Sequence, residues 1–271
     1  MNRTTTIAMA LCAAFPLSAR ADAEEDEALE AIASIGPGTA VAVDRSWLYN
    51  DPTRIAAPGH AVALMRVTYG SGSPTRAFAS NLGPSGALLE FGGEVGLLHG
   101  LSAVAIGAQG QDAGGSAQTG AMLGLRWSLL PRSSQATQLV LSGGFLRELH
   151  GGSGAWGAVS LGHDEGRARF ALSIHGERIF AVGRDSLDVM VTAGATVRLL
   201  QNVRVGIEYV GQDLEGAFSE EEAEGGARHV IGPVVSAALL SQRISLVAGP
   251  AVALGTAQTR VLGRIAVACQ F

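Results

Sequence analysis

The feature that most constrains the fold is an alternation of apolar with small or polar residues, repeated along most of the chain. In residues 187–199 the odd positions hold Leu, Val and Ala, whereas the even positions hold Asp, Met, Thr, Gly and Arg. Successive side chains of a β-strand point to opposite faces, so this pattern predicts a strand with one apolar face. The alternation resumes at residues 203–212 after a short link, and the two segments together predict a hairpin.

The same period recurs often enough to predict an all-β, antiparallel chain of about twelve strands. Short links alternate with longer ones at 71–86, 177–186 and 213–227, which is typical of an up-and-down transmembrane β-barrel. Both ends of the predicted barrel then fall on the periplasmic side. The segments with this period are 60–70, 87–98, 101–109, 117–129, 137–148, 154–162, 167–177, 187–199, 203–212, 228–240, 243–254 and 259–271.

Alternation alone does not separate a membrane barrel from a soluble sheet, because both have one apolar face. The composition of the less apolar face distinguishes a membrane barrel from a soluble sheet. It holds mainly Gly, Ala, Ser and Thr with a few Arg and Glu, and only 16% of all residues are charged, against about 25% in soluble domains. Such a face suits an enclosed lumen better than open water. We therefore expect a closed outer-membrane barrel, with a secreted soluble β-sandwich or barrel as the alternative.

The last strand carries a second indication. Apolar residues alternate up to the terminus at Val261, Ile265, Val267, Cys269 and Phe271. In this the chain resembles Gram-negative outer-membrane β-barrel proteins, whose last strand typically ends in Phe. The resemblance in the alternating strand pattern covers residues 60–271, whereas the resemblance in the terminal motif covers only residues 261–271. It implies outer-membrane lipids and the barrel-assembly machinery as partners, with Phe271, Val267 and Ile265 as the assembly signal.

The aromatic content departs from that class. Only 5% of the residues are aromatic, whereas such barrels carry aromatic girdles at both membrane interfaces. We expect a partial girdle at most, formed by Trp127, Phe145, Phe170 and Tyr209.

The N-terminal part divides into two segments. Residues 1–21 have a basic start, an apolar stretch and a small-x-small triplet, which predicts a signal peptide cleaved after Ala21, with Ala23 as the near alternative. Residues 22–59 form an acidic periplasmic segment and a linker, and the barrel is expected at 60–271. The acidic residues 22–38 are either a disordered tail or a plug for an arginine-lined barrel mouth.

The lumen should carry the functional side chains. The period places Arg126, Arg169, Arg198, Arg204 and Arg243 inward near the periplasmic end, and Glu90, Glu94 and Glu208 inward at mid-barrel or above. One interpretation is a ring of arginines that favours anions. The other is that the arginines pair with the glutamates and fill the lumen.

These observations favour a passive, porin-like channel or a structural membrane component, without catalytic residues or a cofactor. An outer-membrane hydrolase is the alternative, with Ser173, His175 and Glu177 on one strand face as its candidate residues. Loss of residues 1–21 would remove Arg3 and Arg20 and lower the net charge from −5 to −7, which argues against nucleic-acid binding. The histidines lack the spacing of metal ligands, so no metal site is expected.

Overall fold

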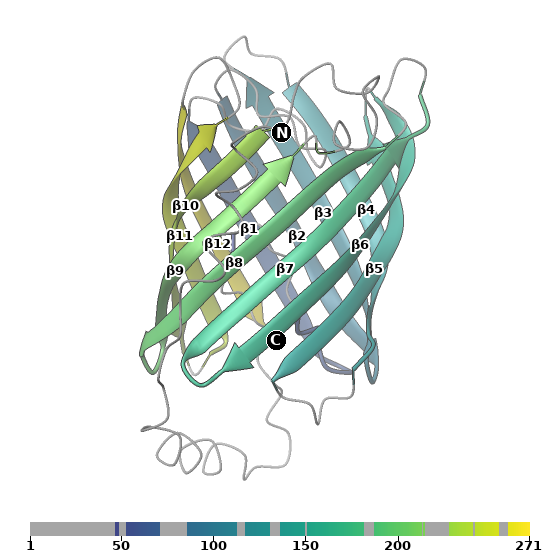
Figure 1. Cartoon of the computed structure of the whole chain (residues 1–271). Coiled ribbons are helices and arrows are strands. Elements are labelled where there is room, and N and C mark those ends of the chain that lie inside the picture. Colours follow the sequence, from purple (N-terminus) through teal and green to yellow (C-terminus); the bar gives the residue numbers. More distant parts are fainter. Residues whose placement is uncertain are drawn as a thin grey trace, which may run out of the picture. The chain divides into compact units, whose positions relative to one another are not determined.

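The structure is a computed structural model that describes residues 47–48, 53–70, 86–112, 117–130, 136–149, 151–181, 187–212, 214, 228–240, 242–254 and 260–271. Twelve antiparallel strands pair in chain order, and β12 pairs with β1 to close the barrel (Figure 1). The predicted all-β, up-and-down barrel of about twelve strands is therefore confirmed. The predicted signal peptide, the acidic segment at 22–38 and the loop 215–227 lie outside the described residues.

Each strand lies where the two-residue period predicts it, and no strand end differs from its predicted position by more than three residues. The strands are β1 (Ala61–Gly70), β2 (Gly86–Leu98), β3 (Leu101–Asp112), β4 (Ala117–Ser128), β5 (Thr137–Glu148), β6 (Gly152–Glu165), β7 (Ala168–Ile179), β8 (Asp188–Leu200), β9 (Val203–Gln212), β10 (Arg228–Leu239), β11 (Ile244–Leu254) and β12 (Arg260–Gln270).

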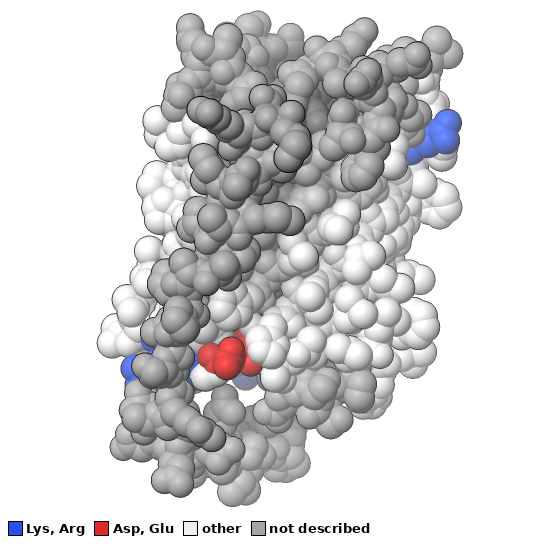
Figure 2. Space-filling view, in the orientation of Figure 1, with Lys and Arg blue, Asp and Glu red and all other residues white. Residues whose placement is uncertain are grey.

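The apolar face of the strands lies on the outside of the barrel. On β4, Leu123, Leu125 and Trp127 are exposed, whereas Met122 and Arg126 at alternate positions are buried. A soluble sandwich would bury its apolar face instead. On the face shown in Figure 2, the described residues carry charge only near the two ends of the barrel. This surface matches the uncharged band that a barrel presents to lipid. No helix in the described part of the chain has the length and hydropathy needed to cross a bilayer.

One end of the barrel, which we call the short-turn end, holds the start of β1, the end of β12 and several tight hairpin turns. Gly100 and Gly166 occupy two of these turns with φ angles of 78° and 53°. Glycine adopts this left-handed conformation at little cost, so these turns can be short. The hairpin predicted at residues 200–202 connects β8 to β9 at the same end.

The ladder between β10 and β11 is interrupted at its centre. Pairing runs to Ile231 and resumes at Val235, and the residues between them have no partner in the register. Each strand has a proline there, Pro233 and Pro250, and proline has no N–H to donate. Several carbonyl groups in this gap consequently need another donor.

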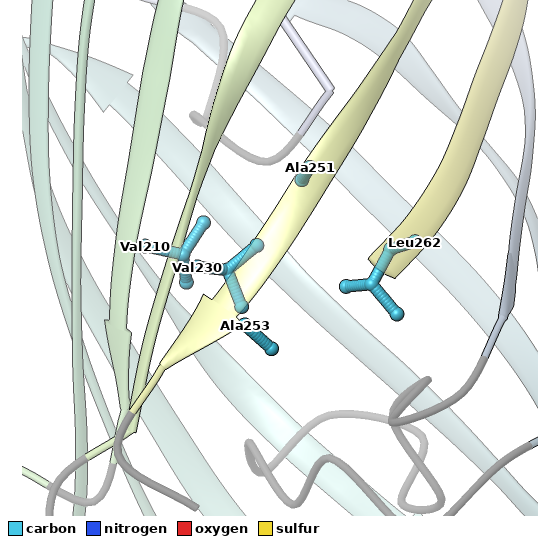
Figure 3. Close-up of a cluster of buried hydrophobic side chains, with 5 residues drawn as sticks. All are labelled: Val210, Val230, Ala251, Ala253 and Leu262. Atoms are coloured by element: carbon cyan, nitrogen blue, oxygen red, sulfur yellow. The ribbon is translucent and has the colours of Figure 1, made fainter. Parts of the chain in front are cut away.

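The interior contains apolar clusters as well as polar side chains. One cluster is formed by inward-facing residues of β9 to β12, drawn in Figure 3: Val210, Val230, Ala251, Ala253 and Leu262. A second surrounds Trp156 of β6 and includes Met122 and Leu146. A third feature is the chain before β1, where Trp47, Leu48 and most of residues 53–57 are buried against the inner wall.

Candidate functional site: the barrel interior

The centre of one charge network is Glu94 of β2, whose side chain is almost fully buried. Its Oε1 accepts hydrogen bonds from Ser102 Oγ and from the backbone N–H of Ala56, each at 2.8 Å. Its Oε2 accepts from Arg126 Nη1 of β4 at 3.2 Å. One carboxylate therefore binds two wall strands and the segment that precedes β1.

A second network fills the gap between β10 and β11. Arg264 of β12 lies across this gap with its side chain wholly buried, and its guanidinium donates to the carbonyls of Gly249, Pro233 and Pro250 at 3.2–3.4 Å. Its Nη1 also lies 3.5 Å from Glu208 Oε2 of β9. The arginine supplies the donors that the prolines lack, and the carboxylate balances its charge.

A third ion pair joins Arg66 of β1 to Glu90 of β2, with Arg66 Nη1 3.1 Å from Glu90 Oε2. The two residues are direct neighbours in the register of these strands. Both side chains are mostly buried. Neighbouring strands thus neutralise charge locally on the inner face.

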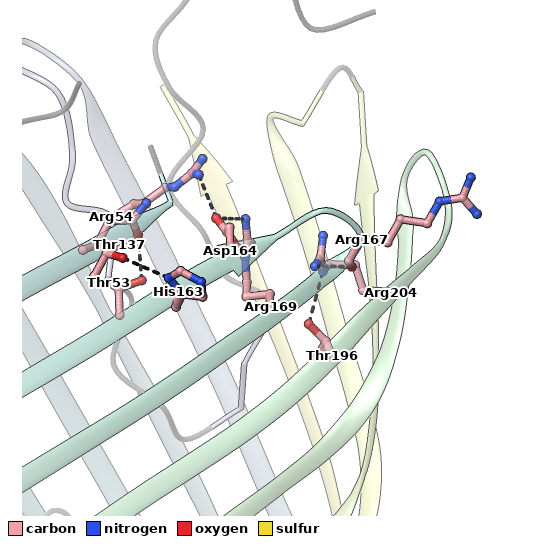
Figure 4. A network of polar contacts seen from close by, with 10 residues as sticks. Thr53, Arg54, Thr137, His163, Asp164, Arg167, Arg169, Thr196 and Arg204 are labelled. Carbon is pink, nitrogen blue, oxygen red and sulfur yellow. Dashed lines mark hydrogen bonds and ion pairs between the residues drawn. The ribbon is translucent and has the colours of Figure 1, made fainter. Parts of the chain in front are cut away.

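The short-turn end carries a more accessible network, shown in Figure 4. Asp164 of β6 binds Arg169 of β7 through both carboxylate oxygens, and it binds Arg54 Nη2 at 2.9 Å. Arg204 of β9 donates from Nε to Thr196 Oγ1 at 3.1 Å and from Nη2 to the Arg167 carbonyl at 3.0 Å. Guanidinium groups therefore line this mouth of the barrel.

Two of the predicted lumen residues lie apart from these networks. Arg198 lies near the end of β8, half-buried and opposite Arg204 in the register. Arg243 lies in the turn that precedes β11, and its side chain is exposed. The structure therefore brings together Glu94 with Arg126, and it places Arg169, Arg198 and Arg204 near one mouth.

Several charged residues of the interior were missing from the sequence prediction. Arg66, Asp188 and Arg264 occupy inward positions of predicted strands. The two-residue period that located their neighbours would have found them too. Arg54 carried no such signal because it precedes β1 and belongs to no strand.

The hydrolase candidates lie close together on the inner face of β7. His175 Nε2 is 3.2 Å from Glu177 Oε2, and the imidazole stacks on Trp156 with ring centroids 5.7 Å apart. Ser173 Oγ, however, is buried without a hydrogen-bond partner in the described part of the chain. A serine nucleophile needs its hydroxyl bonded to the base, and this contact is missing. The described residues also contain no group of three His, Cys, Asp or Glu side chains placed to hold a metal ion.

The outward positions include the expected aromatic residues and the terminal motif. Trp127, Phe145 and Phe170 are exposed on the outer face, and Tyr209 hydrogen-bonds His229 of β10 through its hydroxyl at 2.7 Å. At the C-terminus, Ile265 and Phe271 are exposed and Val267 is half-buried. Backbone bonds in both directions join Phe271 to Ala61 and close the barrel seam.

Comparisons with known proteins identify the fold. No family model matches the chain, and no curated protein matches its sequence. Among solved structures it is similar to the KdgM porin, with 8% identity and a TM-score of 0.53 over 78% of this chain and 99% of that one. The chain has the fold of outer-membrane β-barrel channels.

Two further structures share this channel fold. The NanC porin matches with 11% identity and a TM-score of 0.53 over 76% of this chain and 98% of its own. An outer membrane channel from Pseudomonas putida F1 matches with 8% identity and a TM-score of 0.54 over 88% of this chain and 100% of its own. All three structures are porins or channels, rather than enzymes.

Proposed function

We propose that the protein is a passive, porin-like channel of the outer membrane, without catalytic activity. The observation that carries this proposal is a closed barrel with an apolar outside and charged side chains on its inner wall. An interior that only had to be filled would not need buried arginines, because burying an ion pair is seldom more favourable than burying apolar residues of similar volume. The similarity to porins supports the same conclusion.

The pairing of the inner charges favours a pore with weak charge selectivity. Arg66, Arg126 and Arg264 each lie against a glutamate, so their charges are largely balanced within the wall. The preference of a pore for cations or anions depends on rings of uncompensated charge along its wall. The arginines near the short-turn end add a modest attraction for anions at that mouth. We therefore expect passage of small hydrophilic solutes of either charge.

The remaining parts of the proposal concern export and assembly. Residues 1–21 would direct export and be removed after Ala21, and residues 22–59 would begin on the periplasmic side. The exposed terminal residues Phe271 and Ile265, with Val267, would be recognised by the barrel-assembly machinery. The apolar outer face supports contact with membrane lipids.

Recording from planar lipid bilayers tests the channel directly. The refolded mature chain, checked for a heat-dependent shift in gel mobility, should give discrete conductance steps. Under a salt gradient its reversal potential should lie close to zero. A barrel that folds but never conducts, either unmodified or with Arg54→Ala, which removes the internal contact to Asp164, would contradict the proposal.

A further inference from the structure

The chain before β1 turns back into the barrel. The N–H of His60 donates to the Ala57 carbonyl at 3.0 Å, and Gly59 has a φ of 79°, which forms a tight reversal at the short-turn end. Leu48 and Ala56 have no exposed surface, and Trp47, Thr53, Ile55 and Ala57 are also buried. We call Trp47, Leu48 and residues 53–57 the internal segment.

The internal segment touches the inner wall on widely separated strands. Its contacts reach β1, β2, β5, β6, β8, β10, β11 and β12, so it crosses the lumen instead of following one side. The wall residues involved are Val62, Glu94, Gln138, Gly162, Asp164, Gly194, Val234, Val247, Ala266 and Ala268.

Three polar contacts hold the segment on β2, β5 and β6 of the wall. The Ala56 N–H donates to Glu94 Oε1 at 2.8 Å, Thr53 Oγ1 lies 2.9 Å from Gln138 Oε1, and Arg54 Nη2 lies 2.9 Å from Asp164 Oδ2. The Arg54–Asp164 pair is 29% and 24% exposed at its two side chains. An ion pair with this much solvent contact stabilises only weakly.

The apolar contacts are close but incomplete. Leu48 packs with Val234 and Val247, and the ring of Trp47 lies so near Gly194 that an added Cβ would stand 2.9 Å from its Cε3 atom. The indole N–H of Trp47 is buried with no hydrogen-bond partner in the described residues. An unpaired buried donor costs free energy that is recovered when the group reaches water. The internal segment thus packs closely against the wall residues, but its bound position is only moderately stable.

We propose that the internal segment is a tethered plug that closes the lumen, and that the pore conducts when this segment leaves its seat. The inference rests on the proposed channel function. It assigns closure to residues 47–48 and 53–57, whose chemistry differs from that of the acidic residues 22–38.

A disulfide lock tests whether the segment must move. A Cβ built on Gly162 would lie 2.8 Å from Thr53 Cβ, and a disulfide needs about 3.5–4.5 Å between these atoms, so a small shift of the segment allows the bond. The variant is Thr53→Cys with Gly162→Cys, with Cys12 and Cys269 replaced by serine. When oxidised, the full chain should stop conducting, and a reductant should restore openings.

A loosening variant tests the opposite direction. Loss of an ion pair that is in partial contact with solvent shifts an equilibrium by about two- to fivefold, so Arg54→Ala should raise the open probability by that factor. The matched control is Arg147→Ala, because Arg147 is exposed on the outer face of β5 and its side chain bonds Ser153. The control should conduct like the unmodified chain.

Labelling of a single Thr53→Cys variant with a water-soluble maleimide distinguishes a failure of the plug proposal from a failure of the channel proposal. The plug predicts slow labelling that Arg54→Ala accelerates. Full conductance with an oxidised lock, or conductance with residue 53 never labelled, would overturn the plug but leave the channel standing. Rapid labelling without any conductance would show that the segment moves and would instead contradict the channel function on which the plug depends.

Discussion

The gap between β10 and β11 provides a quantitative test of the interior. Replacing Arg264 with methionine keeps most of the side-chain volume but removes the donors to three carbonyls and the guanidinium beside Glu208. Removing one member of a buried ion pair costs about 3–5 kcal/mol, because the other charge stays buried without compensation. Both side chains are wholly buried, so the free energy of unfolding should fall by about that amount.

A double variant separates the charge from the hydrogen bonds. In Arg264→Met with Glu208→Gln no charge is left uncompensated, and the remaining loss should be about 1–3 kcal/mol from unsatisfied carbonyls. Denaturant unfolding in lipid vesicles, followed by tryptophan fluorescence, measures both losses. Arg147→Met, on the exposed outer face, serves as the control and should stay within about 0.5 kcal/mol of the unmodified chain. If Arg264→Met behaves like this control, the guanidinium does not support the gap.

Three other predictions concern the outer face, the interior and assembly. Leu123→Arg places a charge against lipid and should lower the stability in vesicles by about 2–4 kcal/mol, whereas Leu149→Arg, in an exposed turn, should cost little in the same unfolding assay. Gly194→Val should displace the ring of Trp47, which would appear as a red shift in the fluorescence of a variant retaining only that tryptophan; unchanged emission would contradict the placement. Phe271→Ala should slow barrel insertion assisted by the assembly machinery, measured as appearance of the heat-shifted gel band, and an unchanged rate would argue against recognition of the terminus.

The strands and their faces could be predicted from the sequence because a barrel obeys a strictly local rule. Every second side chain points inward, so the positions of Glu94, Arg126 and Glu208 on their strands follow from the period alone. The proline gap was also accessible, since Pro233 and Pro250 stand in the middle of predicted strands, where proline is unfavourable.

The partners within the interior could not be predicted in the same way. Arg264 reaches Glu208 across two intervening strands, and such a contact depends on the stagger of all the strands between them. The internal segment is harder still. Within residues 22–59, the part before β1 has the sequence of a linker, because nothing local distinguishes a chain outside the barrel from one folded back into it. Only the closed wall, with Gly194 opposite Trp47 and Glu94 opposite Ala56, provides their seat.

The central claim is that the apolar face meets lipid and the other face encloses the lumen, and the three tryptophans of the chain test it directly. Trp127 is exposed on the outer wall, whereas Trp47 and Trp156 are buried inside. Variants that each retain one tryptophan would be refolded into vesicles of lipids brominated on their acyl chains. Strong quenching of Trp127 with little quenching of Trp47 and Trp156 is the predicted result. Equal quenching of all three, or none for Trp127, would contradict the assignment of the two faces.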